Sequence, residues 1–360
     1  MPNPELFDSI QIREVEARNR LWVAPMCQYS VEKQDGVPTD WHLVHLGAFA
    51  VGGAGVVMTE ATAISAEGRI SPEDTGIWND EQVAAWTPIT RFIREHGAVP
   101  AIQLAHAGRK GSTFKPWSPV HGTVPADQGG WQAVAPSAVA FEGYAVPLAL
   151  DAVGIAKVVD DFVAAALRSL EAGFELLEIH AAHGYLLHEF LSPLSNRRED
   201  EYGGDLEGRA RLLLEIVRAV RAAVGESVPL LVRFSATDWA EDGWDEVQTA
   251  TVAGWARDAG ADLFDISTGG LVGGVTIPVA PGYQVGFASF VGAQSDVAVS
   301  AVGLITEAQQ AAQIISSGQA DVVMVAREFL RDPHFPLRAA HELGVPIDYF
   351  PAQYVRAGYR

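Results

Sequence analysis

The chain has 360 residues, of which 48% are hydrophobic and 19% are charged, and this composition excludes an intrinsically disordered protein. The formal net charge of −20 argues against a nucleic-acid partner or an anionic membrane surface, because phosphate groups are bound by basic surfaces. Cys27 is the single cysteine, which excludes an internal disulfide framework, a cysteine zinc site and a cysteine-ligated iron–sulfur cluster.

The amino-terminal segment indicates a cytoplasmic protein. Residues Met1–Glu5 lack the basic and apolar segments of a signal peptide, and no apolar run approaches the ~20 residues that a membrane span needs. Immediately after this start, Ile10, Ile12 and Val15 stand among charged residues. This pattern predicts a small hairpin over Ser9–Arg18.

Short β-branched runs alternate with longer helical patterns through the rest of the chain. The strand candidates are Leu21–Ala24, Gly55–Glu60, Val99–Ala105, Leu176–His180, Leu230–Ser235, Leu263–Ser267, Val297–Val302 and Val322–Arg327. Because strands joined by helices form parallel sheets, eight of them predict an α/β fold, a (β/α)8 TIM barrel in one domain spanning residues 1–360. An open doubly wound sheet is the alternative, but no G-x-G-x-x-G motif follows the first strand.

The connections between the strands include a helix, a capping motif and a long loop. From Asp151 onward, apolar residues recur at helical spacing and predict an amphipathic helix. Thr306 with Gln309 matches a capping box, which would start the helix before the last strand. Residues Lys110–Pro136 are rich in glycine, proline and tryptophan and predict one long loop after strand three.

Polar residues interrupt the strands near their carboxyl ends. Side chains alternate along a strand, so Glu178 and His180 share one face while Leu177 and Ile179 share the other. The other polar positions of this kind are Glu60, Gln103, Arg233, Asp265 and Arg327. Barrel enzymes build their sites at this end. The alternative is a structural role, in which a buried Arg233 pairs with Asp265 or Glu178.

The densest group of such residues is His180-Ala-Ala-His183-Gly-Tyr185 at the end of strand four. Two imidazoles three residues apart can donate N–H groups to one oxygen, and the phenol can donate a proton nearby. His-x-x-His can also bind zinc, with Glu60 or Asp265 as a third ligand. The spacing by itself leaves both interpretations open.

Single residues near other strand ends allow further predictions. Cys27, just beyond strand one, is more typical of a small core hydrophobe than of a reactive thiol. No lysine lies within a strand, which argues against a Schiff-base aldolase. Gly303 and Arg327 follow strands seven and eight, where barrels often bind phosphate, since glycine permits close backbone approach and arginine supplies charge.

Taken in order, these motifs resemble the old yellow enzyme family of FMN-dependent ene-reductases, and most closely its thermophilic-like branch. The motifs are Ala24-Pro-Met-Cys27-Gln-Tyr29, Thr59-Glu-Ala61, Gly68-Arg-Ile70, Ile102-Gln-Leu-Ala-His-Ala-Gly-Arg-Lys110, the segment His180–Asn196, Glu201-Tyr-Gly-Gly204, Val232-Arg233 and Arg327-Glu-Phe-Leu-Arg-Asp-Pro333. They cover nearly the whole chain.

The resemblance implies that FMN lies over the barrel mouth. Gln103 and Arg233 would contact the pyrimidine edge, and Arg233 would stabilise negative charge on the reduced flavin. Gly303, Ala326 and Arg327 would lie at the phosphate. The residues that would line the ring are Ala24, Pro25, Met26, Cys27 and Ala61. Cys27 then becomes a tuner of the flavin potential and a substrate contact, in place of the core role predicted above.

The resemblance also implies a reaction, the reduction of activated alkenes such as enones, enals and maleimides with NAD(P)H as electron donor. His180 and His183 would bind the substrate oxygen, Tyr185 would protonate the α-carbon, and Tyr29 would contact the substrate. NAD(P)H would bind in the same pocket, which suits the missing dinucleotide motif. Reduction of nitro compounds or nitrate esters on the same scaffold is the first alternative, and a metal-dependent barrel hydrolase is a distant one.

Three features depart from the family pattern or vary within it. Ala326 stands where the family usually has glycine, and its methyl group would crowd the phosphate site. The Lys110–Pro136 loop is long, and Trp117 and Trp131 could cap or narrow the pocket. Arg356, near the carboxyl terminus, is the candidate to reach a neighbouring subunit's site in a homo-oligomer, a dimer or tetramer.

Overall fold

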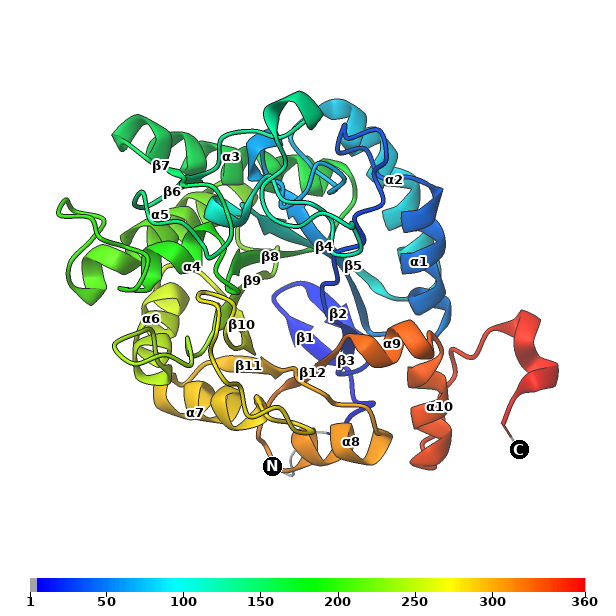
Figure 1. Cartoon of the computed structure of the whole chain (residues 1–360). Helices are drawn as coiled ribbons and strands as arrows, with labels where there is room; N and C mark the ends of the chain where they lie inside the picture. The colour runs from blue at the N-terminus through cyan, green and yellow to red at the C-terminus, as the bar shows by residue number, and fades with distance from the viewer. Residues whose placement is uncertain (1–4, 360) are drawn as a thin grey trace.

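The computed structural model describes residues 5–359, and its centre is a closed barrel of eight parallel strands (Figure 1). The strands, in their order around the barrel, are β3 (Leu21–Val23), β4 (Val56–Ala63), β5 (Val99–Ala105), β8 (Leu176–Ala181), β9 (Leu230–Ser235), β10 (Leu263–Ser267), β11 (Ala298–Ala301) and β12 (Val322–Val325). The predicted (β/α)8 TIM barrel is confirmed. Residues 1–4 and residue 360 lie outside the described residues. The first four belong to the start of the chain, which lacks a signal-peptide pattern.

Helices surround the barrel. They are α1 (Asp40–Val51), α2 (Asp80–Glu95), α3 (Ala152–Glu171), α4 (Leu186–Leu191), α5 (Leu206–Val224), α6 (Glu246–Asp258), α7 (Val285–Ser295), α8 (Ala308–Ser316), α9 (Arg327–Arg331) and α10 (Phe335–Glu342). The side chain of Asp151 caps α3 by accepting the Gly154 N–H, and the predicted helix is confirmed.

The capping box predicted from Thr306 and Gln309 is wrong. Helix α8 begins at Ala308, and its N-cap residue is Glu307, whose side chain makes no capping bond. Because the helix starts later than predicted, Gln310 occupies the third helical position. Its side-chain oxygen accepts the Thr306 backbone N–H at 3.3 Å.

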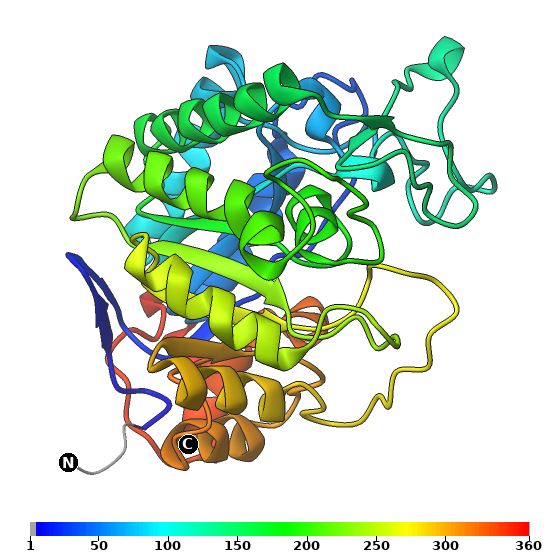
Figure 2. The same ribbon diagram turned by 90° about the vertical axis from the view of Figure 1, so that its left-hand side faces the viewer.

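The barrel interior has an apolar layer below a polar one. Apolar side chains of the lower layer, among them Met58, Leu176 and Leu231, form a buried cluster with Trp22. The hairpin β1 (Ile10–Ile12) and β2 (Val15–Ala17), which confirms the predicted one, packs against this cluster. In Figure 2 it lies on the side away from the long loops at the carboxyl ends of the strands. The amino-terminal end of the barrel is therefore closed, and a site can open only at the other end.

Two sequence-based boundaries shift in the structure. Strand β4 continues to Ala63 through a bulge between Met58 and Ala61. The bulge breaks the side-chain alternation, so Glu60 does not join the polar residues of the interior but pairs with His42 of α1, at 3.2 Å. Arg327 is not the end of the last strand, because β12 ends at Val325 and Arg327 is the first residue of α9.

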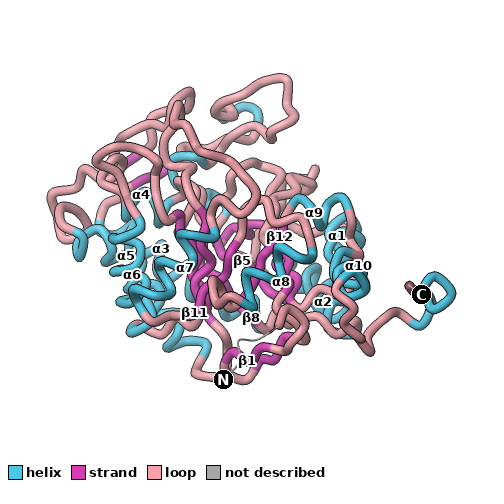
Figure 3. The backbone as a smooth tube through the Cα atoms, turned by 90° about the horizontal axis from the view of Figure 1, so that it is seen from below, coloured by secondary structure: helices cyan, strands magenta, loops and turns pink. Residues whose placement is uncertain are grey.

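The segment after β5 remains largely without regular structure as far as Leu150. It holds only the short helical turns η2 (Gly108–Lys110) and η3 (Ala126–Gln128) and the strands β6 (Val134–Ala135) and β7 (Leu148–Ala149). At the other end of the chain, the tail with η4 (Ala352–Ala357) projects from the body (Figure 3). No helix among the described residues is long and apolar enough to cross a membrane, and the cytoplasmic location remains a prediction.

Candidate active site

The upper layer of the barrel interior is a connected set of polar side chains. Gln103 on β5 donates its amide Nε2–H to Oε1 of Glu178 on β8, at 2.7 Å. Arg233 on β9 forms an ion pair with Asp265 on β10, with 2.7 Å between Nε and Oδ2, and Ser300 donates to the second Asp265 oxygen. All five side chains are buried. The predicted inward orientation of these strand residues is confirmed.

This layer holds two carboxyl groups and one guanidinium. Asp265 has the direct ion pair, whereas one oxygen of Glu178 has no hydrogen-bond partner among the described residues. Burial, together with the negative charge of Asp265, raises the pKa of Glu178. The structural interpretation of Arg233, pairing with Asp265, is confirmed for one edge of its guanidinium.

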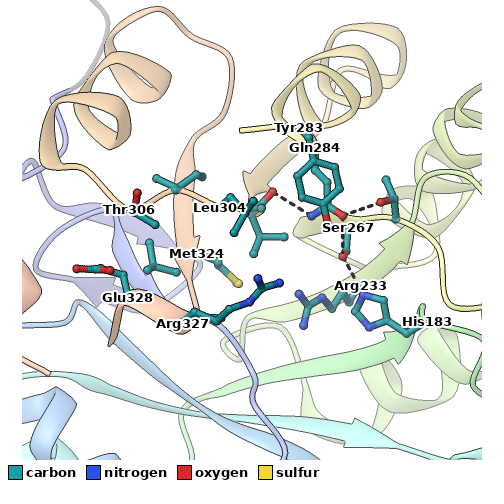
Figure 4. Close-up of a pocket in the computed structure, with 16 residues that line it drawn as sticks. His183, Arg233, Ser267, Tyr283, Gln284, Leu304, Thr306, Met324, Arg327 and Glu328 are labelled. Carbon is teal, nitrogen blue, oxygen red and sulfur yellow. Dashed lines mark hydrogen bonds between the residues drawn. The ribbon is translucent and has the colours of Figure 1, made fainter. Parts of the chain in front are cut away.

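The other edge of Arg233 faces a cavity of about 240 Å³ at the carboxyl ends of β9 to β12. Figure 4 shows the guanidinium groups of Arg233 and Arg327 pointing toward each other across this cavity. Arg327 makes no ion pair with any described residue. Two cations that face one cavity require an anionic ligand, because like charges repel in a partly desolvated site.

Gly303, between β11 and α8, lines the same cavity in a conformation that only glycine adopts easily. Its φ is +123°, and a Cβ atom added there would lie 2.9 Å from Nε2 of Gln284. Gln284 is itself held by a bond from Thr268 to its oxygen and by a bond from its nitrogen to the Val302 carbonyl. A side chain at this position would therefore clash with Gln284 and shift the wall of the cavity.

Ala326 lines the cavity as well, with φ −107°. This φ lies outside the left-handed region, so the backbone does not require the glycine that the family pattern has at this position. Its methyl group packs against the apolar layer of the barrel interior.

The two histidines and the tyrosine predicted at the end of strand four lie together. The His180 ring centroid is 5.3 Å from that of His183 and 5.1 Å from that of Tyr185. His183 has a φ of +58°, and its Nε2 lies 2.8 Å from the hydroxyl of Ser267 on β10. Desolvation and the nearby Arg233 hold the pKa of both imidazoles well below its usual range. Both rings are therefore neutral near pH 7.

Metal binding by the two histidines lacks its third ligand. Glu60 is bonded to His42 and to the Gln28 backbone, and Asp265 is bonded to Arg233 and Ser300. Among residues 5–359, no group of three His, Cys, Asp or Glu side chains is arranged to hold a metal ion.

Residues of the loop after β3 and of β4 form a small cluster with Tyr185. Cys27, Tyr29 and Tyr185 pack against a small apolar cluster that contains Ala61. Burial raises the pKa of the Cys27 thiol and of both phenols, so all three groups keep their protons near pH 7. Trp117 of the long loop meets the Tyr29 ring edge-on at 5.8 Å.

The remaining predicted residues range from buried positions in the barrel to an exposed position in the carboxyl-terminal tail. Ala24 is buried in the barrel interior, Pro25 is half-buried, and Met26 packs against the core between barrel and helices. The Arg69 guanidinium lies over the Trp131 ring, 4.8 Å from its centroid. Arg356, in the projecting tail, is exposed and does not line the cavity of its own chain.

Several residues of the site were missed by the sequence analysis. Ser267 and Gln284 connect His183 to the cavity, and Lys110 donates to the His183 carbonyl at 2.8 Å. His188, paired with Asp238 at 2.9 Å, accepts the Gly184 N–H and holds the same turn. Lys110 and His188 belong to the motifs that resemble the old yellow enzyme family. Their place in those motifs could have identified them as site residues.

Comparisons with known proteins match nearly the whole chain. The model of the NADH:flavin oxidoreductase / NADH oxidase family matches residues 5–345. An NADPH dehydrogenase of Listeria innocua is 45% identical over 354 residues, which are 98% of this chain and 99% of the relative. An NADPH dehydrogenase of Bacillus cytotoxicus is 46% identical over 356 residues, 99% of this chain and 97% of the relative.

Solved structures show the same similarity. Morphinone reductase superposes with a TM-score of 0.79 at 30% identity, over 96% of this chain and 91% of its own. An old yellow enzyme homologue from Zymomonas mobilis superposes with a TM-score of 0.78 at 30% identity, over 97% of this chain and 96% of its own.

We expect Gly303→Ala to weaken FMN binding by about tenfold or more, because the added methyl group would meet Gln284 and the φ of +123° is strained for alanine. Fluorescence titration of the apoprotein with FMN measures this effect. Gly286→Ala on α7 is the matched control, since a Cβ atom there meets nothing within 4 Å. Equal affinity of the two variants would show that Gly303 is not at the cofactor site.

Proposed function

Since the chain belongs to the NADH:flavin oxidoreductase / NADH oxidase family, it is an FMN-dependent NAD(P)H oxidoreductase of the old yellow enzyme type, and we propose that it reduces the C=C bond of α,β-unsaturated carbonyl compounds. Enones, enals and maleimides are the proposed substrates. The observation that carries the proposal is the grouping of His180, His183 and Tyr185 beside the arginine-lined cavity. We propose that residues 1–360 act as one FMN-binding domain.

The residues at the barrel mouth fit FMN. The part of the cavity lined by Gly303 and the Arg327 guanidinium suits a phosphate, so Arg327 and Gly303 would hold it. Gln103 and Arg233 would contact the pyrimidine edge. The Gln103 amide nitrogen is committed to Glu178, which leaves its oxygen available to accept an N–H. Bound FMN supplies the two-electron chemistry between NAD(P)H and the acceptor that side chains cannot provide.

His180 and His183 would bind the carbonyl oxygen of the substrate. A neutral imidazole offers one N–H donor, so the pair can direct two donors at one oxygen. When the β-carbon is reduced, negative charge develops on that oxygen, and donors already in place stabilise it. One such donor is typically worth about 10²–10³ in rate. The bond between His183 and Ser267 fixes the ring that makes this contact.

Tyr185 would protonate the α-carbon. Its phenol is protonated near pH 7 because burial raises its pKa, and its ring stands against that of His180. A donor next to the oxygen-binding pair lies near the α-carbon, which is one bond from the carbonyl carbon. Tyr29 and the Cys27 thiol would contact the substrate.

The absorption spectrum of the purified protein tests the proposal. The visible flavin band should bleach under NAD(P)H without oxygen and should return when cyclohexenone is added. Bleaching without return on any enone, enal or maleimide would reject the alkene assignment. Return with a nitro compound or nitrate ester alone would favour a reductase for those acceptors.

Tyr185→Phe should slow the alkene half-reaction by about 10²-fold and leave flavin reduction by NAD(P)H nearly unchanged, because it removes only the proton donor. Stopped-flow absorbance separates the two half-reactions. Tyr202→Phe, which removes a hydroxyl bonded to Glu215 outside this site, should change neither rate. An equal loss in both half-reactions would show that the Tyr185 phenol is not the donor.

We also propose a homo-oligomer, a dimer or tetramer, in which Arg356 reaches the mouth of a neighbouring subunit. The tail that carries Arg356 projects from the body and exposes Val355 by 71% and Tyr354 by 43% (Figures 1 and 3). Apolar residues exposed on a projecting segment are typical of a surface covered by another chain.

Arg356→Ala should then weaken FMN or substrate binding severalfold while the unfolding temperature stays constant, since the residue makes no contact within its own barrel. Titration calorimetry and thermal unfolding measure the two quantities. Arg91→Ala, at an exposed position of α2, is the control. Unaltered affinities for both ligands would contradict a shared site.

A further inference from the structure

Lys110 joins two loops that meet above the barrel. It ends the turn η2 after β5, and its Nζ donates to the carbonyl oxygen of His183 at 2.8 Å and to that of Gly270 at 3.0 Å. The first acceptor lies in the turn between β8 and α4, and the second lies in the loop after β10. One ammonium group therefore holds loops from three strands together.

The two loops touch through their backbones at the point where Lys110 binds them. A Cβ atom added to Gly184 would lie 2.2 Å from the Gly270 oxygen, and one added to Gly270 would lie 2.7 Å from Cα of His183. His183 itself has the left-handed φ of +58°, which is costly for a histidine. The two carbonyl oxygens share the Lys110 ammonium as a donor, and a carbonyl oxygen removed from water is costly without one.

The same ammonium lies between two aromatic rings. Nζ is 4.9 Å from the ring centroid of Tyr185 and 4.9 Å from that of Phe141, which belongs to the long loop. A cation over a ring is attracted to its electron-rich face, and the attraction grows when the ring carries negative charge. Lys110 thus contacts both the backbone of His183 and the ring of Tyr185.

We propose that Lys110 is a positioning residue that holds His183 and Tyr185 in their working geometry, and that its charge favours the departure of the Tyr185 proton. This inference rests on the proposed function of Tyr185. In that step the O–H bond of Tyr185 breaks, a C–H bond forms at the α-carbon, and the phenolate later regains a proton from water. Lys110 keeps its own proton throughout.

The charge of Lys110 depends on pH. Burial lowers its pKa to about 8, so the ammonium loses its proton as the pH rises through that value. Five titratable or charged groups interact with it, namely Arg109, His180, His183, Tyr185 and Glu189. Burial raises the pKa of Glu189 to about 8 as well, so the two groups must be separated by mutation.

Three variants of the FMN-loaded protein test the proposal. Lys110→Met should slow the alkene half-reaction by about 10²-fold at pH 7 and leave flavin reduction nearly unchanged. Lys110→Arg keeps the charge and should recover much of the rate. Glu189→Gln removes the neighbouring titratable carboxyl group and leaves Lys110 in place. Lys115→Met, which removes a surface lysine paired with Glu32, is the control for the loss of a lysine.

The pH profile distinguishes the charge from a merely structural role. The wild-type alkene half-reaction should fall above about pH 8, and this fall should move to higher pH in Lys110→Arg, vanish in Lys110→Met and persist in Glu189→Gln. A fall that persists in Lys110→Met, or that vanishes only in Glu189→Gln, would overturn the proposal.

Hydrogen–deuterium exchange gives a measurement that does not depend on alkene turnover. Faster exchange of residues 182–185 and 268–271 in Lys110→Met than in Lys115→Met would support the positioning role. Equal exchange in these segments would reject that role. If the wild type reduces no alkene, the proposed function fails, and the exchange comparison still decides whether Lys110 holds the two loops.

Discussion

The burial of a guanidinium inside the barrel is the constraint on which the site depends. Burying the Arg233 guanidinium is costly without an anion, and Asp265 supplies one for a single edge of it. The other edge faces a cavity that Arg327 enters from α9. The apolar layer and the hairpin close the opposite end. The molecule therefore directs the free edge of Arg233 and the Arg327 guanidinium to one opening, where we propose that FMN binds.

The groups to which we assign catalytic roles are held by backbone contacts as much as by side chains. His183 and Gly270 have positive φ, and their carbonyl oxygens share the Lys110 ammonium. The same turn is held from α4, where His188 accepts the Gly184 N–H. These supports fix the position of the His183 imidazole, and the proposed oxyanion stabilisation depends on such a fixed position. Burial lowers the pKa of the His180 and His183 imidazoles and raises the pKa of the Tyr185 phenol. Near pH 7 the two imidazoles are therefore neutral and the phenol keeps its proton.

Predictions from alternation succeeded wherever the strands were regular. Gln103, Glu178, His180, Arg233 and Asp265 all face the interior as their positions predict. The prediction that Glu60 also faces the interior was wrong, because a bulge in β4 turns this side chain toward His42. A bulge depends on the neighbouring strand, and nothing in the local sequence marks it. The start of α8 was wrong by one residue and the end of the last strand by two, within the usual uncertainty of element ends.

The eight-strand barrel, the family and many of the residues at the barrel mouth could be predicted from the chain, because hydrophobic periodicity and motif order are properties of the sequence. Which loops meet above the barrel depends on the three-dimensional fold. Lys110 reaches carbonyl oxygens 73 and 160 residues away, and these meet it because closure of the barrel brings the carboxyl ends of the strands together. Backbone carbonyls are alike in every residue, so no sequence pattern identifies them as partners.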